Sequence, residues 1–209
     1  MKLAAVVALL LMSAACTGGL HSSVAASQVY VLRAAESAAV ITQAVPAGAT
    51  LQVARPSAAP GLESDRIVIV APEHRMSYYA ASQWAAALPV LVETVVVARL
   101  RSAGGWAAVN DSESAFQSEY YLQIGIRRFE AEYTTQALPT VRVSFDCAIG
   151  RRASRELVAS FTVDGAAAAS ANRVGAVVSA FEQALNVALV QLAQHSAAAV
   201  RSSQARSPP

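Results

Sequence analysis

Apolar and polar positions alternate along several short stretches in the first half of the chain. In residues 66–70 an arginine precedes four branched aliphatic side chains. Residues 75–79 form a second extended stretch, and Pro72-Glu73-His74 separates the two. Two such stretches around a short turn are typical of a β-hairpin. Shorter strands are expected at 29–33 and 51–55, where β-branched and aliphatic residues again dominate.

The spacing of apolar positions changes after Trp84. Large aliphatic residues recur three and four apart, Pro89 lies near the start of the run, and Gly104-Gly105 follows it. Proline is tolerated in a first helical turn and glycine marks the end of a helix, so a helix over about 86–101 is predicted. A longer run with the same spacing predicts a second helix over about 171–195, with Ser170 as its N-cap.

Three alternating stretches lie between these helices, at about 120–133, 141–149 and 157–163. In the first of them the apolar phase changes across Arg127-Arg128, so we expect a β-bulge or a strong bend near Arg127. The short connections favour an antiparallel meander with one face in the core. The whole pattern predicts an α+β fold, in which an antiparallel or mixed sheet carries two main helices on one face.

The first residues have the composition of a secretory signal. Lys2 precedes an uncharged apolar run, which small residues and then Cys16 follow. The run is shorter than the roughly 20 apolar residues that a membrane-spanning helix needs. The arrangement resembles the bacterial lipobox, in which this cysteine is acylated after cleavage. Because Ser13 stands where lipoboxes carry a larger aliphatic residue, an ordinary signal peptide with an incidental cysteine stays open.

These observations divide the chain into four expected segments. They are a lipoprotein signal peptide at 1–15, a flexible tether at 16–28, one α+β domain at 29–199 and a disordered tail at 200–209. Thr17, rather than an aspartate, follows the cysteine, which favours sorting to the outer membrane. We therefore expect a lipid-anchored protein on the outer membrane that faces the periplasm.

Composition argues against two classes of protein. The formal net charge is only +2, and no basic face is visible, so no nucleic-acid partner is expected. The hydrophobic fraction of 55% owes much to alanine, and polar residues interrupt each long apolar stretch after the signal, so no further membrane-spanning helix is expected. Cys147 lies in an alternating apolar series, which predicts a buried small hydrophobe rather than a reactive thiol.

The sequence offers no set of residues for catalysis or for binding a metal or cofactor. His21, His74 and His195 are far apart, and each is expected to be solvated. The acidic pairs at 111–113 and 130–132 are also expected to be solvated charges rather than an acid–base pair. We therefore expect a protein that is not an enzyme and has no cofactor.

Aromatic residues near the predicted hairpin are the candidates for a functional surface. Tyr78, Tyr79 and Trp84 either cover the core where helix and sheet meet or form a protein-contact patch. Arg66 either makes an ion pair at a strand edge or provides a charged contact to a partner. The sequence leaves both pairs of alternatives open.

The same region carries a family resemblance. It consists of Tyr30-Val-Leu32, Leu51-x-Val53-x-x-Pro56, Gly61-Leu-x-x-Asp65-Arg66-Ile67, Tyr78-Tyr79, and Trp84 before a helix that starts with proline. In these motifs the chain resembles the ABC-type transport auxiliary lipoproteins, which include the PqiC-like lipoproteins. The resemblance implies a lipid-anchored adaptor or scaffold that works with an MCE-domain protein and an inner-membrane ABC transporter. Such systems move lipids or other hydrophobic molecules across the cell envelope, and a homo-oligomer is possible.

A lipid-binding carrier is the alternative function. A carrier would hold its cargo between helix and sheet, so an apolar cavity under the 171–195 helix would favour it. A filled core with open sheet edges would favour the adaptor.

Overall fold

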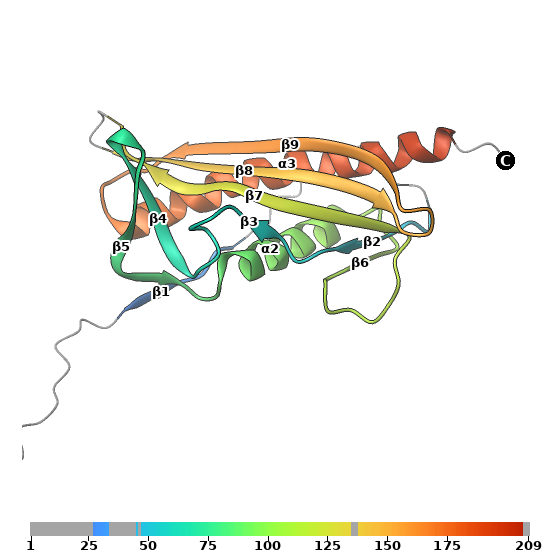
Figure 1. Ribbon diagram of the computed structural model, residues 1–209, viewed down its shortest axis with the longest axis horizontal. Coiled ribbons are helices and arrows are strands. Elements are labelled where there is room, and N and C mark those ends of the chain that lie inside the picture. The colour runs from blue at the N-terminus through green and yellow to red at the C-terminus, as the bar shows by residue number, and fades with distance from the viewer. Residues whose placement is uncertain (1–26, 34–44, 46, 135–137, 207–209) are drawn as a thin grey trace, which may run out of the picture.

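The computed structural model describes residues 27–33, 45, 47–134 and 138–206. Figure 1 shows the strands and helices that these residues form. In chain order they are β1 (Gln28–Tyr30), β2 (Thr50–Val53), β3 (Ser57–Ala58), β4 (Arg66–Ala71), a 3-10 turn (Pro72–His74), β5 (Arg75–Trp84), α2 (Leu88–Ala103), β6 (Ala108–Asn110), β7 (Tyr120–Glu132), β8 (Thr140–Arg151), β9 (Glu156–Ala168) and α3 (Val174–Arg206).

Strand β7 lies at the centre of one mixed sheet. On one side it pairs antiparallel with β8, which pairs antiparallel with β9. On its other side it pairs in parallel with β2, β3 and β4 at successive positions along its length. Beyond these, β6 pairs with β2, β5 pairs with β4, and β1 pairs with β5. The predicted α+β class and the predicted hairpin and meander are confirmed.

The expected irregularity in β7 is also confirmed. The register between β7 and β8 shifts between Ile126 and Arg128. Before the shift Ile124 and Ile126 are buried, and after it Phe129 and Ala131 are buried. The extra residue therefore keeps the apolar side chains of one long strand on the core face.

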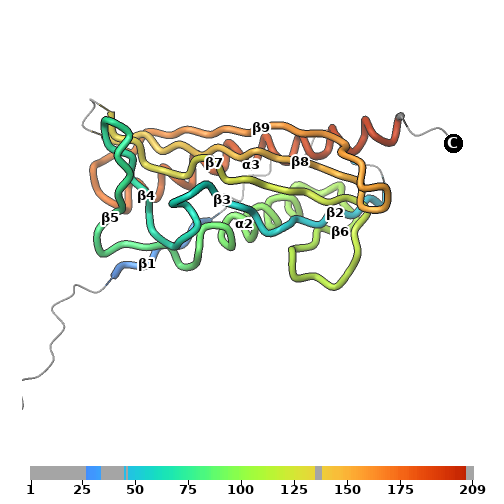
Figure 2. The backbone as a smooth tube through the Cα atoms, in the orientation of Figure 1, coloured from blue at the N-terminus to red at the C-terminus, as the bar shows by residue number. Residues whose placement is uncertain are grey.

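Helix α3 packs directly on β8 and β9, as the long red and orange segments in Figures 1 and 2 show. Its packed face is rich in small side chains, including Ala180, Ala184 and Ala188, all of which are buried. Opposite them lies Gly165 of β9, where an added Cβ would stand only 1.9 Å from the carbonyl oxygen of Ala184. Since the two backbones approach this closely, only glycine fits at this position.

The ends of the helices differ from the predicted ones. Helix α3 begins at Val174, so Ser170 lies too far upstream to be its N-cap. At the other end it continues to Arg206, so the tail expected from residue 200 is helical as far as that residue. Val200 and Ser203 are buried there, and the Ser203 hydroxyl lies 3.4 Å from the Tyr120 hydroxyl. The last turns of α3 are therefore packed through small side chains. The large apolar residues from which a helix is predicted are absent there.

The sequence predicted no membrane-spanning helix after the signal. By length and apolar composition, however, α3 could span a membrane over Val174–Ala205. In the structure, 61% of its most apolar window is buried inside the protein. The apolar face that meets this criterion is therefore the one that packs on the sheet, as in the core helix of a globular domain.

Candidate functional site

Arg66 and Tyr78 lie next to each other on the β4–β5 hairpin. The guanidinium carbon of Arg66 stands 3.5 Å from the centre of the Tyr78 ring, which is a cation–π contact. Within the described part of the chain Arg66 has no ion pair, so the alternative of a strand-edge ion pair is not found and this contact takes its place. Arg66 is exposed and Tyr78 is half-buried, so the pair forms part of the protein surface.

Tyr79 belongs to a short chain of hydrogen bonds at the same end of the sheet. Its hydroxyl lies 2.9 Å from that of Tyr133, which donates to Oδ1 of Asn172 over 2.7 Å. Because Tyr133 has a single proton to donate, Tyr79 acts as the donor to Tyr133. Burial, together with this contact, raises the pKa of Tyr79. The hydrogen bonds connect β5, the end of β7 and the segment before α3.

Trp84 is a core residue. Only 1% of its surface is exposed, and its ring meets Phe181 edge-on, with centroids 5.2 Å apart. Phe129 stacks on Phe181 at 4.9 Å and lies 6.0 Å from Trp84. The three rings come from β5, α3 and β7, and they join the hairpin to the rest of the core. Trp84 therefore takes the core alternative, and its side chain is not available to a partner.

Two of the three histidines are exposed, His74 in the 3-10 turn and His195 on α3, where its ring lies 5.2 Å from that of Phe161. His21 and Cys16 lie outside the described residues. Cys147 is buried, and burial raises its pKa to about 12, with a smaller contribution from Asp146. A thiol with this pKa is not a nucleophile at neutral pH. Over the described segments no three His, Cys, Asp or Glu side chains gather as a metal site would require.

The acidic pair at 130–132 is not solvated as expected. Arg128 pairs with Glu130 over 2.7 Å and with Glu132 over 3.3 Å, and Arg142 of β8 pairs with Glu132. The hydrogen bond from Arg142 is the main cause of the lowered pKa of Glu132. The strand register, which places Glu130 opposite Arg142, brings these groups together. At the other pair, Glu113 forms an ion pair with Arg55 over 2.8 Å.

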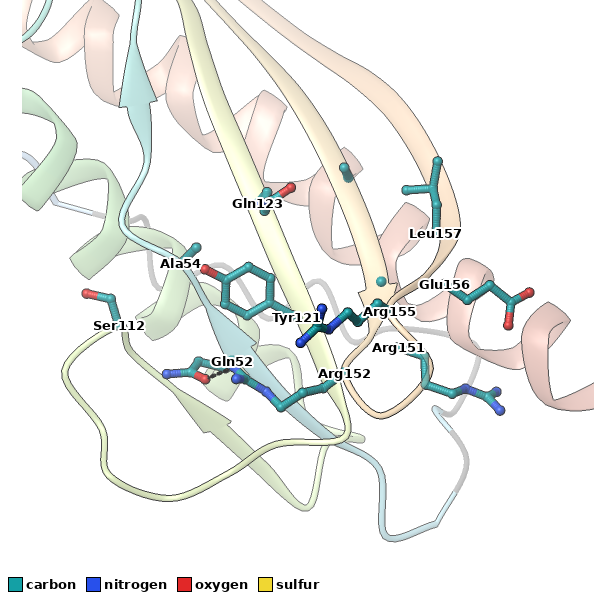
Figure 3. A pocket seen from close by; sticks show the side chains of 12 residues that line it. Gln52, Ala54, Ser112, Tyr121, Gln123, Arg151, Arg152, Arg155, Glu156 and Leu157 are labelled. Atoms are coloured by element: carbon teal, nitrogen blue, oxygen red, sulfur yellow. Dashed lines mark hydrogen bonds between the residues drawn. The ribbon is translucent and has the colours of Figure 1, made fainter.

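A pocket that sequence reasoning missed lies where the β8–β9 turn meets β2 and β7 (Figure 3). It has a volume of about 650 Å³. Arg152 donates a hydrogen bond to Oε1 of Gln52, and its guanidinium carbon lies 5.1 Å from the centre of the Tyr121 ring. Figure 3 shows Arg155 extending toward Tyr121 as well, whereas Arg151 points away. The only signal in the sequence is three arginines within residues 151–155.

The chain matches the family of the ABC-type transport auxiliary lipoprotein component over residues 30–193. It belongs to that family. The match covers most of the chain and includes the hairpin, the meander and most of α3. The resemblance found in the sequence motifs is therefore confirmed, and the family is one of transport components rather than of enzymes.

Solved structures agree with this assignment. The auxiliary lipoprotein is similar to protein XCC0632 from Xanthomonas campestris, with 28% identity and a TM-score of 0.74, covering 87% of this chain and 99% of that one. A second structure, of an uncharacterised protein, has 16% identity and a TM-score of 0.62, with 85% and 99% of the two chains covered. The second likeness shows the fold alone. No protein of curated function matched the chain.

Proposed function

We propose that this auxiliary lipoprotein is a lipid-anchored adaptor, facing the periplasm from the outer membrane, in an ABC and MCE-type transport system. Its cargo would be lipid or another hydrophobic molecule. Membership of the transport auxiliary family over residues 30–193 supports a role beside an ABC transporter. The lipobox-like Cys16 supports the anchor, and the MCE-domain partner comes from the resemblance of the sequence motifs.

The contact between Gly165 and Ala184 carries the choice of an adaptor over a carrier. At this point a single added carbon on β9 would already collide with the backbone of α3. Around it, Val163, Phe181 and Leu185 are completely buried. An acyl chain is far larger than one carbon, so cargo between this helix and the sheet would have to separate them and lose this packing. The filled interface supports a protein that acts through its surface.

The position of β1 is compatible with an anchor at one end of the molecule. Gln28 starts this strand near one end of the long axis (Figure 1). An extended segment from Cys16 to Gln28 would reach at most roughly 40 Å. A domain attached in this way stays within about one domain length of the membrane.

Intact mass and sucrose-gradient fractionation of bacterial envelopes test the anchor. The expected species begins at Cys16, carries acyl groups and is found in the outer-membrane fraction, while the Cys16→Ser chain is soluble in the periplasm and folded. An unmodified soluble species that is cleaved elsewhere would remove the anchor from the proposal.

Cross-linking in intact envelopes tests the adaptor role. A tagged chain is expected to form cross-links to an MCE-domain protein and to an ABC transporter subunit. Native mass spectrometry of the Cys16→Ser chain should show no stoichiometric phospholipid. Bound phospholipid in that experiment would favour the carrier instead.

We propose three of the candidate residues as a partner contact: the exposed Arg66, the half-buried Tyr78 that it contacts, and the half-buried Tyr79. Arg66→Ala should weaken the cross-link without unfolding the protein, since it removes one surface contact. A homo-oligomer is part of the same proposal, and sedimentation of the full chain in a mild detergent measures it directly.

A further inference from the structure

We propose that Arg152 and Arg155 form a binding site for a carboxylate in an acidic, extended segment of a partner protein. The inference rests on the proposed adaptor function, because it names the kind of segment that the adaptor recognises. It concerns the pocket at the β8–β9 turn and uses no part of the Arg66–Tyr78 surface.

The two arginines are arranged to receive an anion. The backbone N–H of Arg152 donates to the carbonyl of Glu119 over 2.9 Å, and its side chain is held by Gln52 and lies against Tyr121. Arg155 enters the same pocket from the turn (Figure 3). Guanidinium groups bind carboxylates through two parallel N–H donors, and an arginine that is already positioned loses little freedom on binding.

In the described part of the chain, Arg152 and Arg155 lack the carboxylate partners that neutralise other arginines on the sheet. Arg55, Arg127, Arg128 and Arg142 each form an ion pair with a carboxylate. Among the described residues neither Arg152 nor Arg155 has such a partner, although Glu156 lines the same pocket. The residues that line the pocket include three arginines, Arg151, Arg152 and Arg155, and one glutamate, so the pocket has a net positive charge, which attracts an anionic group.

Arg155 also holds an unusual backbone conformation. Its φ is +56°, in the left-handed region that glycine and asparagine adopt more easily. Glycine or asparagine would form this turn with less strain, so the arginine is consistent with a binding role for its side chain.

The shape of the hollow favours an extended chain over a compact ion. A second hollow of about 470 Å³ shares Ala54, Tyr121, Gln123 and Ala148 with the first. It continues past Gly125 and Ser160, which are small and leave room, and past Asp146, whose carboxylate is paired with Arg127. Together the two hollows form one groove with the arginines at one end. An extended peptide with an acidic residue fits such a groove, whereas a phosphate ion would occupy only its end.

The place of the groove favours a protein partner over the membrane surface. The β8–β9 turn lies at the opposite end of the long axis from β1, as Figures 1 and 2 show. If the anchor enters at β1, this end can point away from the outer membrane into the periplasm.

Fluorescence anisotropy with a labelled decaglutamate peptide tests the site on the full chain in a mild detergent. The double variant Arg152→Gln with Arg155→Gln should bind at least about tenfold more weakly than the wild type. Arg75→Gln removes one positive charge in the β4–β5 hairpin, as Arg155→Gln does in the pocket, and should change binding by less than about twofold. Hydrogen exchange with the peptide bound should show protection in 148–158.

If the double variant is unstable, the same binding measurement is made with the single variant Arg155→Gln. Among the described residues the side chain of Arg155 forms no ion pair and no cation–π contact, so its replacement should leave the fold intact and still weaken binding severalfold. Equal losses in Arg155→Gln and Arg75→Gln would show attraction by overall charge only, and would overturn the proposal. So would vesicles of phosphatidylglycerol that bind through these arginines while decaglutamate does not.

Cross-linking separates this inference from the function on which it rests. If the double variant cross-links to the transport partner as well as the wild type does, the arginine site is not the docking site and the adaptor function stands. If the wild type forms no such cross-link, the adaptor function fails, whatever the peptide measurements show.

Discussion

The side-chain amide of Gln191 on α3 closes the edge of the sheet at Asp164. Its Oε1 accepts a hydrogen bond from the backbone N–H of Asp164 over 3.2 Å, and its Nε2 donates to the carbonyl of the same residue over 2.9 Å. Strand β9 pairs only with β8 among the described strands. Gln191 thus occupies the position that a further strand would take, and it limits edge-to-edge association at this point.

Replacing Gln191 should weaken the fold and open this edge. Gln191→Ala removes two hydrogen bonds, and we expect a loss of about 1–2 kcal/mol in the free energy of unfolding. Urea denaturation measures this loss, and light scattering detects any new association. Gln194→Ala, at an exposed position on the same helix, should change neither quantity. If both variants behave alike, the amide does not protect the edge.

Gly165→Ala should be among the most destabilising single-carbon changes in the protein. The new methyl group would meet backbone rather than a flexible side chain, so α3 must shift. Forced overpacking of this kind costs typically about 1–3 kcal/mol. Gly175→Ala, where the nearest atom would be 3.8 Å away, is the matched control and should be neutral or slightly stabilising. Thermal unfolding of the two variants distinguishes a filled interface from a loose one.

Trp84→Ala should test the aromatic core. Removing a buried indole that contacts Phe129 and Phe181 is expected to cost about 3–5 kcal/mol in stability. Phe116 is 78% exposed, so Phe116→Ala should have little effect on denaturation. A small loss at Trp84 would mean that the three rings do not join hairpin, sheet and helix as described.

Glu132 should contribute stability that depends on pH. Its pKa is lowered in the folded protein, mainly by Arg142, so its contribution is complete above the pKa of the unfolded chain. The contribution is lost as pH falls through the lower, folded pKa. The wild type should therefore lose its advantage over Glu132→Gln between about pH 5 and pH 2 in urea titrations. Glu63→Gln, which changes an exposed residue, is the control variant for the loss of one carboxylate.

Cys147 should be protected from alkylation in the native protein. It is buried, and its pKa is raised to about 12, so the thiolate is scarce at neutral pH. Iodoacetamide followed by peptide mass spectrometry should modify it only after unfolding. Ser160→Cys, an exposed position in β9, should react rapidly in the folded chain. Rapid modification of native Cys147 would contradict the packing of β8.

Local patterns determined the elements that are continuous in the sequence. The hairpin around Pro72, the bulge near Arg127 and the central part of both helices follow from the period of apolar positions and from nearby turn residues. Each of these features depends on contacts between residues close together along the chain. The motifs spread along the chain identified the family, because they extend over most of the domain and not over one element.

The tertiary structure alone decided which distant segments meet. Periodicity does not show that β2, β3 and β4 line up in parallel along one strand. It also does not show that Trp84 lies under α3, or that Gln52 holds Arg152 at a separation of 100 residues. These contacts depend on the register and packing of whole elements, which maximise burial over the entire domain. The sequence therefore determined the longer strands and the central parts of the helices, and the packing between them determined which side chains remain on the surface to bind a partner.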